Sequence, residues 1–139
     1  MFSEIWSFPD SGQFIEFVNI SSEPINLQSD GLDLFLGGGG VSFDFSKSAV
    51  PILAPRERIV VVRQGRREEF HQRFPTVDPA RIAGEFAGEL PTIGRLVLTA
   101  HDIVLHDFVY GSDITWPAAD AIEVTNPWLR GDLVDGIFW

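Results

Sequence analysis

The sequence contains no cysteine and no long hydrophobic run. Without cysteine the chain can form no disulfide, no thiolate metal site and no cysteine nucleophile, and its redox compartment cannot be inferred. No apolar run approaches the roughly 20 residues that a helix needs to cross a bilayer. The opening MFSEIWSFPD has neither a basic segment nor a continuous apolar one, so it does not predict a signal peptide. We expect no membrane insertion.

Positive charge is also scarce. Ten Lys and Arg residues stand against twenty Asp and Glu residues, giving a net charge of -10. Such a field repels phosphate backbones, so we expect no nucleic-acid partner. Residues 56–73 are an exception, with six arginines and three glutamates. A solvated helix start with intermixed glutamates explains this stretch, and a local basic patch is the alternative.

What the chain does contain is apolar residues. They make up 45% of its 139 residues and include 12 Phe and 4 Trp, which is enough to build one globular core and is unlike a disordered tail. The length fits a single domain over residues 1–139. The chain ends on the apolar GIFW, which suggests a domain excised from a longer protein.

Short apolar or alternating runs recur along the chain, separated by turn residues. The predicted strands are residues 4–8, 13–20, 32–36, 41–45, 58–62, 84–88, 95–99, 103–110 and 121–125. The connections PDSG, SSEP, SDG, PTIG and GSD supply typical turn residues. One short helix is predicted at RREEFHQRF, residues 66–74, with acids in its first turn. The pattern predicts an all-β domain, an antiparallel sandwich of about nine strands with one short helix.

The segment HDIVLHD, residues 101–107, resembles a set of metal ligands. We expect His101 and Asp102 to form the turn of a hairpin, with His106 and Asp107 farther along its second strand. At about 3.3 Å per residue, His106 then lies some 16 Å from His101, and neighbouring strand residues point to opposite faces. The segment therefore predicts a hairpin and no metal site.

His106 is expected to share its face with Val104, Phe108 and Tyr110, as a partly buried histidine hydrogen-bonded to backbone. Glu16 is a single carboxylate in QFIEFVN, a strand with apolar residues on both faces. The chain has no G-x-S-x-G motif, and no recognisable pair of catalytic carboxylates occurs among its acids. Acidic loops such as SDGLD keep calcium open as a ligand, although no EF-hand pattern is present. No other cofactor is predicted.

Three stretches, taken in order, resemble the lamin tail domain in its bacterial form. They are FSEIWSFPDSGQFIEFVNISSEPINL, then ILAPRERIVVVRQ with FHQRFP and GEFAGEL, and finally GRLVLTAHDIVLHDFVYGSDITWPAADAIEVTNP. Together they span residues 2–127. The sequence departs from the family pattern at His106, where the family usually has Asp, and after Trp-Pro, where a Gly-rich segment is shortened to AADA.

The resemblance implies an immunoglobulin-like β-sandwich that serves as a non-catalytic interaction or assembly module. Its partner would be another protein or other domains of the same chain, in a secreted or envelope-associated protein; the oligomeric state stays open. The resemblance singles out Glu16, Asn19, His106, Tyr110 and Trp116 as interaction or structural residues. Trp116 is expected to plug the core or an end of the sandwich, or to form a stacking platform for a sugar. A carbohydrate-binding or calcium-assisted adhesion domain is the alternative function.

Overall fold

The computed structural model describes residues 2–6, 12–29, 32–36, 40–91, 94–110 and 121–123, and only the backbone of 2–6, 32–36, 108–110 and 121–123. The strands are β1 (Phe2–Trp6), β2 (Phe14–Val18), β3 (Ile25–Asn26), β4 (Leu32–Leu36), β5 (Ser42–Asp44), β6 (Ile52–Leu53), β7 (Arg58–Arg63), β8 (Ile82–Phe86), β9 (Gly94–Ala100), β10 (Ile103–Tyr110) and β11 (Ala121–Glu123). The helices are α1 (Arg67–Arg73) and the 3₁₀ turns η1 (Phe45–Lys47) and η2 (Pro79–Arg81).

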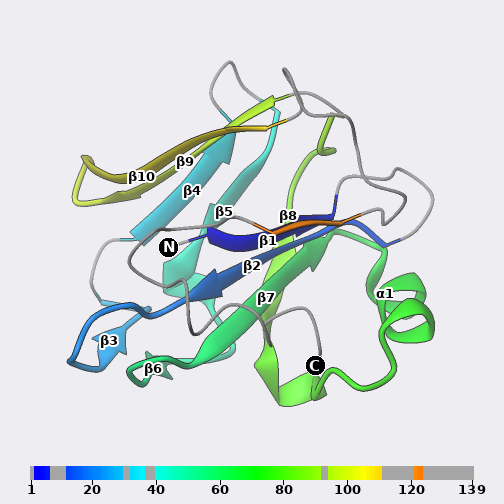
Figure 1. Ribbon diagram of the computed structural model, residues 1–139, viewed down its shortest axis with the longest axis horizontal. Helices are drawn as coiled ribbons and strands as arrows, with labels where there is room; N and C mark the ends of the chain where they lie inside the picture. Colours follow the sequence, from blue (N-terminus) through cyan, green and yellow to red (C-terminus); the bar gives the residue numbers. More distant parts are fainter. Residues whose placement is uncertain are drawn as a thin grey trace.

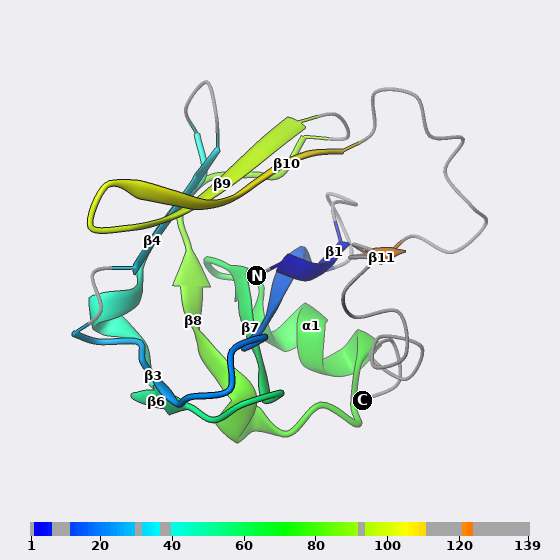
Figure 2. The ribbon, with the colours of Figure 1, turned by 60° about the vertical axis from the view of Figure 1, so that its left-hand side comes forward.

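The strands form two main sheets (Figures 1 and 2). One has the order β11-β1-β2-β7-β8 and the other the order β10-β9-β4-β5, while β3 and β6 pair with each other. The expectation of an all-β structure with one short helix is confirmed over the described residues. No helix among them is long and apolar enough to cross a membrane.

Each predicted strand segment overlaps an observed strand, and the predicted helix overlaps α1. The strand predicted to reach residue 45 ends at Asp44, because the Asp44 carboxylate accepts the backbone N–H of Ser46 and caps η1. The two-residue strands β3 and β6 were not predicted. Two residues are too few to show a period, so the sequence carried no signal for them.

The expectation of a purely antiparallel domain is wrong for one strand pair. β8 runs parallel to β7, whereas the other paired strands are antiparallel. The chain between β7 and β8 contains α1, which returns it to the end of the sheet from which β7 began. Parallel neighbours require such a crossover, whereas a hairpin turn joins antiparallel ones. The crossover that contains α1 and η2 thus accounts for the parallel direction of β8.

The main core lies between the two large sheets. It takes alternate residues of β2 and β7, such as Ile15 and Val61, and packs them with Leu96 and Leu98 of β9. Phe43 and Phe45 close it from the β5 side, with their rings 5.0 Å apart in an edge-to-face contact. Period-2 alternation thus directs one face of each strand into a shared interior.

A second apolar cluster lies on the opposite face of the five-stranded sheet, beneath α1. Phe70 of α1, which is 1% exposed, packs edge-to-face on Phe14 of β2 with centroids 5.4 Å apart. Val60 and Val62 of β7 complete the cluster with their neighbours. β2 and β7 are thus buried on both faces, which explains why their sequences are apolar at nearly every position.

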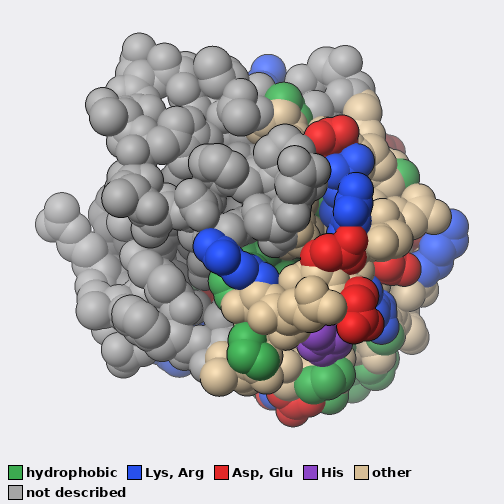
Figure 3. Space-filling model, turned by 90° about the vertical axis from the view of Figure 1, so that its right-hand side faces the viewer, with side chains coloured by type: hydrophobic (Ala, Val, Ile, Leu, Met, Phe, Trp, Pro, Cys, Tyr) green, Lys and Arg blue, Asp and Glu red, His purple; other side chains and the backbone are tan. Residues whose placement is uncertain are grey.

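The arginine-rich residues 56–73 lie on a mixed surface. Figure 3 shows basic and acidic side chains beside one another on the face that carries α1. Arg66 and Glu69 form a 2.8 Å ion pair one helical turn apart, and Arg63 reaches Glu89 at 3.2 Å. Because the positive charges have acidic neighbours, this face is better described as a solvated surface of mixed charge than as a basic patch.

Candidate interaction surface

The two residues that open HDIVLHD form the turn between β9 and β10. His101 and Asp102 have positive φ angles of 48° and 64°, and Ala100 pairs with Ile103 on either side of them. Two positive φ angles in a two-residue loop are typical of a type I′ turn, which matches the twist of a hairpin. The described residues hold no group of three or more His, Asp or Glu placed to bind a metal ion.

β10 forms one edge of the four-stranded sheet, and among the described strands it pairs with β9 alone. Its first three residues are exposed: Ile103 by 67%, Val104 by 56% and Leu105 by 56%. We call these three residues the β10 apolar edge. Proteins commonly blunt an edge strand with charge or proline, and these three positions carry neither. The hairpin lies at one end of the sheet in Figure 2.

A β-bulge sits within this edge. Val104 pairs with Thr99 and His106 with Leu98, so Leu105 is the extra residue between them. The expectation that His106 shares a face with Val104 is therefore wrong, because one added residue reverses the alternation. His106 stays in step with Phe108 and Tyr110, which lie opposite Leu96 and Gly94.

A small apolar cavity lies behind the edge. Its volume is about 60 Å³, and Leu105 lines it together with Ile25 of β3 and Leu53 of β6. The other lining residues come from the main core and include Phe17 and Leu98. The exposed apolar surface of β10 thus connects with the interior at Leu105, because this side chain is partly exposed and also lines the cavity.

Polar groups follow the apolar edge along β10. Arg95 of β9 donates to Asp107 through Nε at 2.7 Å and through Nη2 to the second carboxylate oxygen, and this pairing lowers the pKa of Asp107. Burial lowers the pKa of the half-buried His106, although the charge of Asp107 opposes the shift.

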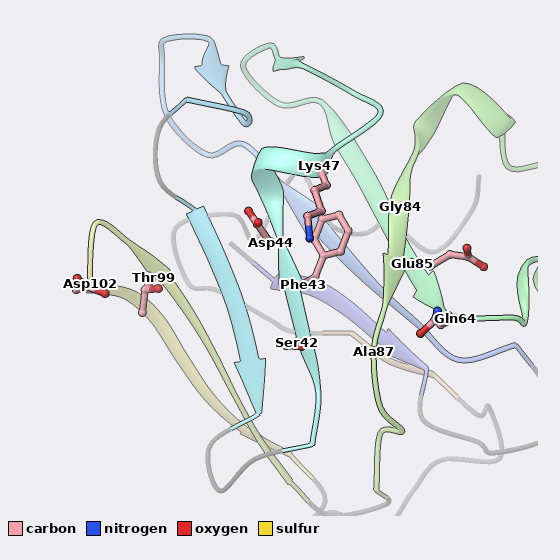
Figure 4. A pocket seen from close by; sticks show the side chains of 10 residues that line it. All are labelled: Ser42, Phe43, Asp44, Lys47, Gln64, Gly84, Glu85, Ala87, Thr99 and Asp102. Atoms are coloured by element: carbon pink, nitrogen blue, oxygen red, sulfur yellow. The ribbon is translucent and has the colours of Figure 1, made fainter.

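A larger groove opens between β5 of the four-stranded sheet and β8 of the five-stranded sheet (Figure 4). Its volume is about 680 Å³, and residues of β5, β8, β9 and adjoining turns line it. The edges of β5 and β8 meet at its base, where Ser42 and Ala87 exchange backbone hydrogen bonds of 3.2 and 3.0 Å. Asp44 and Glu85, two residues farther on, are not paired by a backbone bridge among the described residues.

The charged groups of this groove do not converge. In Figure 4 the carboxylates of Asp44 and Glu85 point away from each other, with the ring of Phe43 between them. Asp44 caps η1, and Glu85 accepts the backbone N–H of Gly65 at 3.1 Å. A pair of carboxylates sharing one reacting bond, as in hydrolysis of a glycoside, requires convergence. The described side chains of the groove do not provide it.

Glu16 is buried in β2 with 1% of its side chain exposed, and its Oε1 lies 3.3 Å from Nε of Arg58 in β7. A buried carboxylate requires such a partner, since an isolated charge in the interior is costly. The backbone register also sets Glu16 opposite Glu4, and Glu4 opposite Glu123. Three glutamate positions thus form a row across β2, β1 and β11, which the sequence did not reveal because the three strands are far apart in the chain.

Asn19 organises the turn after β2. Its side-chain nitrogen donates to the backbone oxygens of Glu23 and Leu53, each at 2.9 Å, and its side-chain oxygen accepts from Ser21. It is 1% exposed. All of these contacts are internal, so Asn19 holds the β2–β3 loop against β6 and is structural.

The two remaining predicted residues are described less fully. Tyr110 ends β10 and pairs through its backbone with Gly94. Trp116 lies outside the described residues, so its expected role as a plug or stacking platform stays a prediction.

Sequence reasoning missed Gln13, which is fully buried. Its side-chain amide donates to the backbone oxygen of Leu90 at 2.8 Å and accepts the Leu90 N–H at 3.0 Å. The side-chain amide of Gln13 thus makes the two backbone hydrogen bonds with Leu90 that a neighbouring strand would otherwise make. The only signal was a polar residue directly before an apolar strand, and that pattern is common at strand starts.

We compared the chain with protein-family models, curated proteins and solved structures, and none of them matches. The resemblance to the lamin tail domain therefore stays a prediction.

Proposed function

We propose that this chain is a non-catalytic protein-interaction module that binds through the β10 apolar edge. The observation that carries the proposal is the run of three exposed apolar residues, Ile103 to Leu105, on an edge strand. An edge strand offers backbone hydrogen-bonding groups, and apolar side chains beside them add affinity and position. Asn19 and Glu16 have internal partners and support the scaffold that presents this edge.

The lamin tail resemblance supports the same role. We propose an immunoglobulin-like sandwich of the bacterial lamin tail type, working within a larger secreted or envelope-associated protein. The parallel β7–β8 pair would be a departure within that architecture. The assembly function proposed for this chain needs no reacting group, in keeping with the divergent carboxylates of the groove (Figure 4).

The direct test places a photo-crosslinking amino acid at Val104 in the cells that produce the protein. We expect irradiation to give a covalent adduct with a polypeptide. The same amino acid at Gln72, an exposed position on α1, is the control and is expected to give no defined adduct. The proposal fails if Val104 gives no more adduct than Gln72.

A second measurement separates a binding role from a folding role. The variant Val104→Thr keeps the β-branched shape but removes apolar surface, and it is expected to change the melting temperature by less than about 2 °C, as surface substitutions usually do.

A glycan array and a melting curve in millimolar calcium test the adhesion alternative. A specific glycan, or a calcium-dependent rise in melting temperature, would replace the present proposal.

A further inference from the structure

We propose that the groove beside the β10 apolar edge receives an arginine side chain of the polypeptide partner, held by Asp44, Asp102 and the hydroxyl of Thr99. This inference rests on the proposed function, because it names a chemical feature of the partner that lies on the β10 apolar edge. Its basis is a buried hydroxyl without a partner among the described residues, together with the charges around it.

Thr99 is the side chain that points to a ligand. It is 7% exposed, it lines the groove, and its hydroxyl makes no hydrogen bond to any described residue. The large majority of buried polar side chains have a hydrogen-bonding partner, because burial without one is costly. Figure 4 shows Thr99 between Asp102, on the hairpin turn, and Asp44, on β5. An N–H donor that enters the groove would supply the missing partner.

The groove carries an excess of negative charge. Three of its lining residues are acidic, namely Asp44, Glu85 and Asp102, and one is basic, Lys47. Glu85 points away from Asp44 (Figure 4) and accepts a backbone N–H, so it is set apart from the other two acids. The carboxylate of Asp102 makes no hydrogen bond or ion pair with a described residue. The charges therefore favour a cationic group at the end of the groove where Thr99 lies.

The register of the four-stranded sheet connects this end of the groove to the β10 apolar edge. Val104 pairs with Thr99 across β10 and β9. Asp33 of β4 then pairs with Thr99 on one side and with Asp44 of β5 on the other. Directly opposite residues share one face of a sheet, and like charges so placed are destabilising, which a nearby cation relieves. A partner that covers Val104 thus has an acidic row directly beside it.

An arginine side chain matches these acceptors better than a metal ion or a lysine does. The described residues hold no group of three acids placed to bind an ion, and a calcium ion needs its oxygen ligands within about 2.6 Å. A guanidinium group is planar and has five N–H donors that point in several directions. It can reach a hydroxyl and a carboxylate at once, whereas the ammonium of lysine is a compact point charge.

NMR spectra of the isotope-labelled intact chain test the inference with a defined probe, N-acetyl-arginine amide. We expect the backbone amide signals of Asp44, Thr99 and Asp102 to move as the probe is raised through the low millimolar range, since a single solvent-accessible charged contact binds weakly. N-acetyl-citrulline amide is the matched control, with a similar shape and no charge, and it should leave these signals in place. Equal shifts with the two probes would overturn the inference.

Three variants separate binding from folding and from net charge. Thr99→Val keeps the shape and removes the hydroxyl, and its melting temperature should not fall, because the hydroxyl has no described partner to lose. Asp102→Asn removes one charge, and asparagine tolerates the positive φ of 64° at this position. Each should need at least about threefold more arginine for the same shift. Glu85→Gln, which removes the acid set apart from the site, should leave the response unchanged; an equal loss there would overturn the site.

Two other cations are included as competing outcomes. If calcium chloride moves the signals of Thr99 and Asp102 while the arginine and citrulline probes do not, the ligand is a metal ion and the inference is wrong. If N-acetyl-lysine amide moves them as strongly as the arginine probe does, the choice of arginine is wrong.

The outcome for the proposed function is read separately. If the arginine probe does not bind while the crosslinker at residue 104 captures a polypeptide, the interaction module stands and only this inference fails. If the probe binds at Thr99 while residue 104 captures nothing, the groove stands as an arginine site and the β10 apolar edge is not the contact. A captured segment that contains no arginine, located by mass spectrometry, would also overturn the inference.

Discussion

Replacing Gln13 by methionine tests whether one buried amide holds the segment before β9 to the sheet. The Gln13 side chain is fully buried and makes two hydrogen bonds to the backbone of Leu90. Methionine has similar length and volume, so Gln13→Met removes the polar atoms with little loss of packing. The backbone N–H and C=O of Leu90 are then left buried without these partners.

The magnitude follows from those two groups. Leaving a buried backbone donor or acceptor without a partner costs about 1 to 3 kcal/mol. Two such groups predict a loss of about 2 to 6 kcal/mol in the free energy of unfolding, and local relaxation would move the loss toward the lower end of this range. For a chain of this size each kcal/mol lowers the melting temperature by roughly 3 to 5 °C.

Urea unfolding followed by tryptophan fluorescence measures the loss, and Gln28→Met is the matched control. Gln28 is exposed and donates to the backbone oxygen of Ser48 at 2.9 Å in a partly buried contact, so its replacement is expected to cost about 1 kcal/mol or less. The reasoning is refuted if Gln13→Met costs no more than Gln28→Met.

Three further outcomes are expected from the backbone and the charges. Gly88→Ala should cost about 3 kcal/mol or more in urea unfolding, since its Cβ would lie 1.6 Å from a backbone oxygen, whereas Gly65→Ala, with a similar positive φ but open space, should cost about 1 kcal/mol. Asp102→Gly should raise the melting temperature, gaining about 0.5 to 1 kcal/mol by relieving a positive φ in the hairpin turn; a lower melting temperature would contradict this. The hydrogen bond from Arg81 lowers the pKa of Glu57 below its ordinary 4.5, so the stability from this pair is complete above pH 4.5 and lost as the pH falls through the lowered pKa. Glu57→Gln should therefore flatten the acid side of the stability curve measured by urea unfolding, and an unchanged curve would contradict the assignment.

Sequence periodicity located the larger strands because alternation directly reports which residues face a core. It also placed the turn at His101 and Asp102, because these are the polar residues between two apolar runs that each predict a strand. It did not reveal that β8 runs parallel to β7, because direction depends on where the chain returns and not on the pattern within a strand. The same limit hid the row formed by Glu4, Glu16 and Glu123.

The candidate surface was only half visible in the sequence. HDIVLHD drew attention through its histidines and acids, yet the proposed binding surface consists of the apolar residues between them, which are exposed on an edge strand. Two facts changed that reading, namely the edge position of β10 and the bulge at Leu105. Exposure at Val104 arises from the sheet order, which is a long-range property. A single extra residue in one strand also reversed the face expected for His106.

The two edges of the four-stranded sheet are built differently, and the contrast bears on function. At β5 the edge is bridged to Ala87 and then continues with charged residues, Asp44 and the nearby Lys47. Charge on an edge is a common device against unwanted pairing. β10 begins instead with Ile103, Val104 and Leu105, and of these only Leu105 is known to line the interior cavity. Apolar side chains that expose more than half of their surface contribute little to the core, so folding does not account for them at this edge, and the function proposed above gives them a binding role.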